Sequence, residues 1–208
     1  MEQTDHADVP IVVVGICGSL RAGSYTRMAV KTALRGAVEA GAQTHLLDLA
    51  DYDLGFAGRG GKTEPAGVTA LRGLVKEADG IILGTPEYHG SFSGVLKNAL
   101  DHMGFTEFEG KMVGLVGVSG GTMGAFDALN SLRNVGRALH AWVIPEQASV
   151  PEAWKVFEDS GEVKDAEIAG RLLTVGRQVA RFARLHKCAA AGEFLKRWEA
   201  APVNPGGE

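Results

Sequence analysis

Short, mostly apolar runs alternate with segments of helical periodicity along almost the whole chain. Strands that are apolar throughout are buried on both faces, and strands joined through helices run parallel. The pattern therefore predicts an α/β fold in which a doubly wound, five-stranded parallel sheet lies between two helical layers. The predicted strands are 11–16, 43–48, 80–84, 112–118 and 140–145, and the predicted helices are 25–41, 67–77, 92–102, 123–139 and 163–188.

The length of 208 residues suits one domain, which we expect to occupy residues 1–200. We expect the Pro- and Gly-containing tail 201–208 to be disordered and the glycine-rich segment 55–65 to form a mobile loop. A net charge of −4, with both signs mixed, argues against a nucleic-acid or anionic-membrane partner. The apolar runs are too short to span a membrane, the start 1–8 is too polar for a signal peptide, and two cysteines fit a reducing compartment. We therefore expect a cytoplasmic protein.

The loop after the first strand, residues 18–26, carries the strongest functional signal. It leads directly into a predicted helix, whose N-terminal N–H groups favour phosphate. The hydroxyls of Ser19, Ser24 and Thr26 and the guanidinium of Arg21 add further donors to phosphate. Alternatively, the hydroxyls only cap the helix and Arg21 is solvated, but one hydroxyl is enough for a cap. The loop predicts a phosphate site.

Two common nucleotide loops do not match the chain. The dinucleotide fingerprint needs G-x-G-x-x-G, whereas glycines stand here at 15, 18 and 23. Asp48, at the end of the second strand, is therefore interpreted as a helix or turn cap. The Gly-Lys-Thr at 61–63 would need glycine where Phe56 stands, and no strand precedes it, which argues against a kinase or NTPase.

The loop after the third strand predicts a wall for a flat ring. Pro86 fixes one backbone dihedral, Gly90 permits close approach, and Tyr88 offers an aromatic surface. Glu87 and His89 are either ordinary loop residues or groups that transfer protons, and the sequence favours neither.

The loop after the fourth strand, 118–124, joins strand to helix with little side-chain bulk. It lies against the same ring or is simply a tight turn. Because ligands of parallel sheets bind outside the carboxyl ends of the strands, we expect these three loops to converge.

Three segments resemble, in order and spacing, the flavodoxin-like NAD(P)H-dependent FMN reductases, a family that includes quinone, azo and chromate reductases. They are GICGSLRAGSYT, GTPEYHGSFSGVLKNALDH and GVSGGTMGAF, and the similarity spans about residues 10–145. The resemblance implies an FMN cofactor, NADPH or NADH as co-substrate, and a homodimer or homotetramer with the flavin near the interface. It implies that Ser19, Arg21, Ser24, Tyr25 and Thr26 hold the FMN phosphate, and that Pro86, Glu87, Tyr88, His89 and Gly90, with Ser119 and Gly120, line the ring. The family often has Asn where this chain has His89.

The resemblance implies that a hydride passes from nicotinamide to FMN and then to a quinone, azo compound, flavin or similar small-molecule acceptor. No nucleophile stands beside a base and no residues have metal-ligand spacing, so we predict no catalytic side chain and no metal ligand. His102 is interpreted as a residue at a helix C-terminus. The alternative function is a flavodoxin-like electron carrier, although a charge of −4 supplies little acidity for docking. The sequence leaves open the preferred nicotinamide, the acceptor, and whether segment 145–163 covers the site or an interface.

Overall fold

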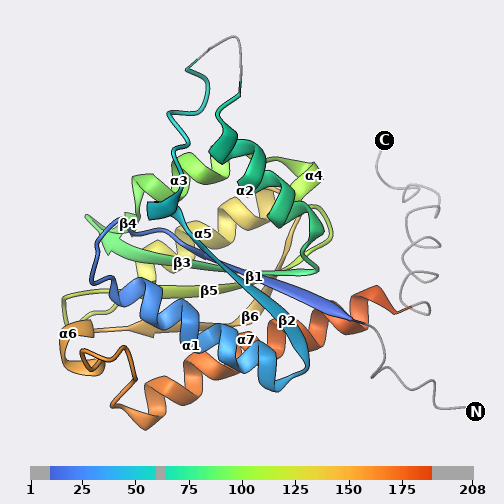
Figure 1. Ribbon diagram of the computed structural model, residues 1–208. Helices are drawn as coiled ribbons and strands as arrows, with labels where there is room; N and C mark the ends of the chain where they lie inside the picture. The colour runs from blue at the N-terminus through green and yellow to red at the C-terminus, as the bar shows by residue number, and fades with distance from the viewer. Residues whose placement is uncertain (1–9, 60–63, 189–208) are drawn as a thin grey trace, which may run out of the picture.

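The structure, a computed structural model, describes residues 10–59 and 64–188. Its centre is a sheet of five parallel strands (Figure 1), as predicted. A two-residue strand, β4 (Ser91–Phe92), pairs antiparallel with the end of β3 and adds a sixth strand that the sequence did not predict. The parallel strands lie in the order β2 (Ala42–Asp48), β1 (Ile11–Cys17), β3 (Gly80–Tyr88), β5 (Met112–Val118) and β6 (Trp142–Val150).

Helices cover both faces of the sheet, which gives three layers (Figure 1). The face of α1 and α7 and the face of α2, α3 and α5 each bury a separate hydrophobic core against the strands. This is the doubly wound arrangement that the alternating pattern predicts. The helices are α1 (Tyr25–Glu39), α2 (Ala66–Glu77), α3 (Gly94–Asp101), α4 (Phe105–Phe108), α5 (Phe126–Ala138), α6 (Ala153–Val156) and α7 (Ala166–Lys187), with the 3-10 turn η2 (Leu49–Asp51) after β2.

Helices α1 and α7 pack with their backbones in close contact. A Cβ added to Gly36 would lie 2.0 Å from the Leu173 carbonyl oxygen, and one added to Gly176 would lie 1.7 Å from that of Ala33. Only glycine permits this approach. The contact fixes α1 on the sheet and therefore fixes its N-terminus, where the predicted phosphate loop ends.

Two strands extend well beyond their predicted ends. β3 continues through Tyr88, so the residues expected to form the third loop are largely strand. β6 continues past Pro145 to Val150, and its register on β5 shifts there, since Val113 pairs with Val143 whereas Leu115 pairs with Gln147. A proline is tolerated there because β6 is an edge strand.

Helices α3, α5 and α7 begin two or three residues later than predicted. Ser93 and Asp165 are the N-caps of α3 and α7, and each accepts a backbone hydrogen bond through its side chain. Gly124 has φ +74°, which is not helical, so α5 starts after it. The tail 201–208 and part of the predicted mobile loop lie outside the described residues.

Candidate functional site

The loops after β1 and β3 are joined by hydrogen bonds. The Gly18 N–H donates to the Gly84 carbonyl at 2.8 Å, and the Ser93 hydroxyl donates to the Gly18 carbonyl at 2.6 Å. A Cβ on Gly18 would lie 2.8 Å from the Gly84 oxygen and from Cβ of Leu96. Glycine at 18 is therefore required for the two loops to meet.

The phosphate loop predicted at 18–26 is shaped by its own polar residues. Ser24 caps α1 by accepting the Arg27 N–H at 3.2 Å. The Arg27 guanidinium donates to the Ala22 carbonyl at 2.6 Å and pairs with Asp48. Asp48 also accepts the Ala50 N–H as the N-cap of η2, which confirms its interpretation as a cap.

Cys17 lies behind this loop as a buried, free thiol. Its sulfur is 3.9 Å from the Ser24 hydroxyl. Burial, and then the nearby Asp48 carboxylate, raise the pKa of the Cys17 thiol. The thiol is therefore neutral near pH 7 and brings no negative charge to the loop.

The third loop is a tight hairpin. His89 and Gly90 connect β3 to β4 with φ of +53° and +74°. Positive φ at both central residues is the requirement of a type I′ turn, which Asn-Gly satisfies best. The turn gives a structural reason for Asn at this position in the resembling family, and for the tolerance of His, which also adopts positive φ more readily than most residues.

The Glu87 carboxylate makes a hydrogen bond to the backbone of helix α5. Its Oε2 accepts the Ala128 N–H at 3.0 Å, in the first turn of α5. A carboxylate at a helix N-terminus satisfies an amide that has no partner within the helix. Glu87 therefore ties the end of β3 to α5, which is the structural role that the sequence left open.

The fourth loop is fixed by the end of β6. The Ser119 N–H donates to the Val150 carbonyl at 2.9 Å, and the Ala153 N–H donates to the Ser119 carbonyl at 3.0 Å. These bonds place α6, with Trp154, beside the loop. Part of the segment 145–163 therefore borders the site.

The three loops and α6 enclose one pocket of about 320 Å³. All the predicted site residues line it except His89 and Gly90, which lie in the hairpin. Four lining residues were not among the predicted ones, and Trp154 among them belongs to segment 145–163, for which the sequence left open whether it covers the site or an interface. The predicted residues that line the pocket are Ser19, Arg21, Ser24, Tyr25, Thr26, Pro86, Glu87, Tyr88, Ser119 and Gly120, and the further ones are Gly23, Val118, Ala153 and Trp154.

The pocket combines a cation suited to an anion with an aromatic surface suited to a flat apolar group. Within the described residues, Arg21 has no carboxylate partner, and its guanidinium lies 5.7 Å from the centre of the Tyr88 ring. A Cβ added to Gly23 or Gly120 would meet no protein atom within 4 Å. Protein packing therefore does not require glycine at these two positions, whereas a ligand that approaches the backbone closely would.

The described chain carries no helix long and apolar enough to cross a bilayer.

A family model described as NADPH-dependent FMN reductase matches residues 11–155, which include all three loops. The chain belongs to this family. It is therefore an oxidoreductase that uses FMN and NAD(P)H.

Characterised relatives agree with this membership. The chain is 32% identical over 202 residues to the NADPH-dependent FMN reductase ArsH of Shigella flexneri, covering 93% of this chain and 78% of the relative. It is 38% identical over 151 residues to the FMN-dependent NADPH-azoreductase of Staphylococcus saprophyticus, covering 69% and 79%. The fold matches the apo form of the NADH:FMN oxidoreductase EmoB with a TM-score of 0.69 at 23% identity, covering 86% of this chain and 91% of that one.

The pocket fits the FMN that the family implies. FMN ends in a single phosphate, and the first loop offers hydroxyl and guanidinium donors, with no carboxylate of the described residues paired with Arg21. Open space over Gly23 and Gly120 also fits FMN, because a ligand bound close to the backbone needs such space.

Proposed function

We propose that this enzyme holds FMN in the pocket at the carboxyl ends of β1, β3 and β5 and passes electrons from NAD(P)H to a flat small-molecule acceptor such as a quinone, azo compound or flavin. The observation that carries the proposal is the position of Arg21 beside the Tyr88 ring in one pocket, where no carboxylate of the described residues pairs with the guanidinium.

The residues divide between the two ends of the cofactor. Ser19, Arg21, Ser24, Tyr25 and Thr26 would hold its phosphate, since they line the pocket around the N-terminus of α1. The backbone of Pro86 to Tyr88, with Ser119 and Gly120, would lie against the isoalloxazine ring.

When bound, FMN supplies the hydride chemistry, accepting from nicotinamide and donating to the acceptor. The chain's own task is to bind and orient the reactants. Tyr88 and Trp154 line the pocket and are 41% and 57% exposed, so each offers an aromatic face on which a planar acceptor can stack. Such surfaces do not distinguish strongly among flat molecules, which favours a broad acceptor range.

A spectroscopic experiment tests this function. The purified protein loaded with FMN is expected to be yellow, to lose its colour anaerobically on addition of NADPH or NADH, and to regain it with a quinone or an azo dye. A yellow protein that neither nicotinamide bleaches would instead support the electron carrier, which has no substrate of its own. A protein whose spectrum does not change on adding FMN contradicts both functions.

We also propose that the enzyme forms a homodimer or homotetramer and works in the cytoplasm. Met123, Phe126 and Trp154 are more than half exposed on the loop after β5, the start of α5 and α6, and a partner subunit would bury this apolar surface. Sedimentation velocity of the FMN-loaded protein measures the oligomeric state, and a monomer at micromolar concentration would contradict it.

A further inference from the structure

Two buried hydroxyls connect the end of β3 with the loop after β1. The Thr85 hydroxyl donates to the Pro86 carbonyl at 2.8 Å and accepts the Ser93 N–H at 3.0 Å. The Ser93 hydroxyl donates to the Gly18 carbonyl at 2.6 Å. Thr85 and Ser93 are 0% and 2% exposed, and neither lines the FMN pocket. Any effect that these hydroxyls have on a ligand must therefore pass through the backbone that they hold.

The Ser93 hydroxyl has two separable roles. Its oxygen accepts the Leu96 N–H at 3.1 Å and so caps α3, whereas its hydrogen is donated to Gly18. A hydroxyl offers one hydrogen and two lone pairs, so both bonds can exist together. Capping α3 needs the oxygen alone. The bond to Gly18 therefore does something that the cap does not require.

The bond to Gly18 sets the direction of the peptide group between Gly18 and Ser19. A trans peptide is planar, and its C=O and N–H point in opposite directions. Because the Gly18 C=O points to Ser93, the Ser19 N–H points away from Ser93. The Gly18 N–H is held independently by the Gly84 carbonyl at 2.8 Å.

The Ser19 N–H is a donor without an acceptor in residues 10–59 and 64–188. The other polar groups of Ser19 have neighbours: its hydroxyl accepts the Arg21 N–H at 3.5 Å, and its carbonyl lies 3.9 Å from the Cys17 sulfur. Ser19 also lines the FMN pocket. A backbone N–H that lines a pocket and has no protein acceptor can donate to an anion, and such charge-assisted bonds are strong.

We infer that Ser93 is a positioning residue for the cofactor, whose hydroxyl hydrogen turns the peptide group of Gly18 and Ser19 so that the Ser19 N–H faces the FMN phosphate. The inference rests on the proposed function, which places this phosphate at the first loop. Without the Ser93 hydroxyl the Gly18 carbonyl loses its partner, and glycine resists rotation of the peptide group least of all residues. The N–H would then be aimed less well at the phosphate.

The affinities of FMN and riboflavin for Ser93→Ala test the inference. Riboflavin is FMN without its phosphate, so the ratio of the riboflavin Kd to the FMN Kd measures what the phosphate contributes. Quenching of flavin fluorescence on titration with apoprotein gives both constants. We expect S93A to lower the ratio about tenfold, the contribution of one hydrogen bond to a charged group, and to change the riboflavin Kd little. An unfolded fraction of the protein affects both titrations alike and cancels in the ratio.

Ser93→Gly separates the effect on the phosphate from the effect on α3. Glycine is a much better N-cap than alanine, so S93G should melt closer to the wild type than S93A does. Both variants lack the hydroxyl hydrogen, so both should lower the affinity ratio by the same factor. If S93A does not fold, S93G measures the ratio in its place.

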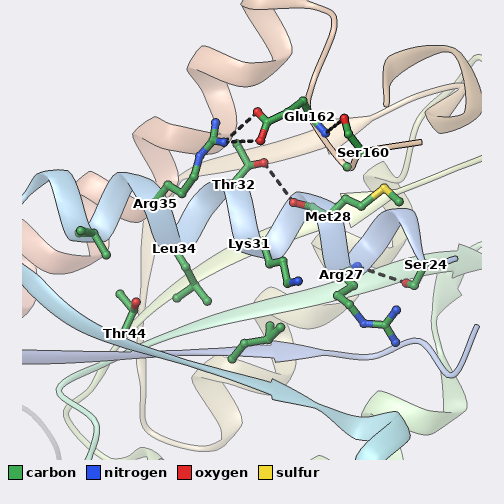
Figure 2. Close-up of a pocket in the computed structure, with 13 residues that line it drawn as sticks. Ser24, Arg27, Met28, Lys31, Thr32, Leu34, Arg35, Thr44, Ser160 and Glu162 are labelled. Atoms are coloured by element: carbon green, nitrogen blue, oxygen red, sulfur yellow. Dashed lines mark hydrogen bonds and ion pairs between the residues drawn. The ribbon is translucent and has the colours of Figure 1, made fainter. Parts of the chain in front are cut away.

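Thr32→Val is the matched control. Thr32 is 2% exposed, and its hydroxyl donates to the Met28 carbonyl at 3.1 Å within α1 (Figure 2). Thr32 does not line the FMN pocket. T32V therefore removes a buried hydroxyl that donates to a carbonyl, as S93A does, but it should leave the affinity ratio unchanged.

An affinity ratio in S93A and S93G equal to that of the wild type would overturn the inference. So would a ratio that falls only in S93A and follows the loss of stability, or one that falls as far in T32V, because the hydroxyl would then act on the fold in general. These outcomes leave the proposed function intact as long as the wild type binds FMN more tightly than riboflavin. If the wild type bound the two equally, the proposed phosphate site would fail, and the inference would fail with it.

Discussion

Replacing Gly23 or Gly120 of the pocket with alanine should stabilise the folded protein and weaken the binding of FMN. Neither Gly23 nor Gly120 has positive φ, and an added Cβ would touch no protein atom within 4 Å. Alanine at such a position stabilises a protein by about 0.4–1 kcal/mol, because it restricts the unfolded chain. If FMN occupies the space above Gly23, the same methyl group would collide with it.

The two effects of Gly23→Ala can be given magnitudes. A gain of about 0.4–1 kcal/mol should raise the Tm of the apoprotein by about 1–4 °C in a domain of this size. Inserting a methyl group into a filled space typically costs about 1–3 kcal/mol. At 1.4 kcal/mol per tenfold change, FMN should therefore bind about 5- to 150-fold more weakly.

Thermal melts of the apoprotein and quenching of FMN fluorescence measure these two quantities. Gly73→Ala is the matched control, because Gly73 lies in α2 with equally open space around it and outside the pocket. It should raise the Tm without changing the FMN affinity. A higher Tm with unaltered FMN affinity in both G23A and G120A would refute the placement of the ligand, and a lower Tm of G23A would refute the stability argument itself.

Three further substitutions probe other parts of the chain. Arg21→Ala should weaken FMN binding about tenfold or more and change the apoprotein Tm little, since its proposed ionic partner is the ligand and it loses only the exposed contact with Tyr88; equal FMN affinities would contradict this. His89→Asn should raise the apoprotein Tm slightly without altering FMN affinity, because Asn suits the type I′ turn better; a loss of FMN would show that the imidazole contacts it after all. Glu107→Gln should lower the free energy of unfolding by about 1–3 kcal/mol at pH 7 in urea titrations, since Glu107 is buried and accepts from Arg72 and Gly104. Although burial opposes it, these bonds lower the pKa of Glu107, so its contribution is present above the ordinary glutamate range and disappears as pH falls through the lowered value. The difference between E107Q and the wild type should therefore shrink as the pH falls below the ordinary glutamate range, and a constant difference would contradict the assignment.

The sheet and its loops could be predicted because their signals are local. Buried parallel strands produce unbroken apolar runs, as at Ile11 to Ile16 and Met112 to Val118, and the rule that ligands bind at the carboxyl ends then selects the loops. Chain order alone brings these ends to one edge of the sheet. No tertiary contact had to be known in advance.

The remaining parts of the site depend on contacts between distant residues. The last strand was predicted to end at 145, and its continuation to Val150 depends on a register shift against β5 between Val113 and Leu115, which no local pattern indicates. Trp154 follows the true end of β6, and the sequence alone could not decide whether its segment, 145–163, covers the site or an interface. The hairpin at His89 and Gly90 was missed for a similar reason, since a two-residue strand has no periodicity.

The pairing of charged side chains is the property that the sequence shows least and the fold shows most. Arg27, Lys31 and Arg35 have identical spacing on one helix, and their local sequence does not rank them. Asp48 is 21 residues from Arg27 along the chain and Glu162 is 127 from Arg35, yet these partners neutralise the two arginines, whereas no carboxylate of residues 10–59 and 64–188 pairs with Lys31. Arg21 is likewise without a carboxylate partner within the described ranges. Because a cation that the protein does not pair is available to an anionic ligand, Arg21 is the cation that the proposed FMN phosphate would meet.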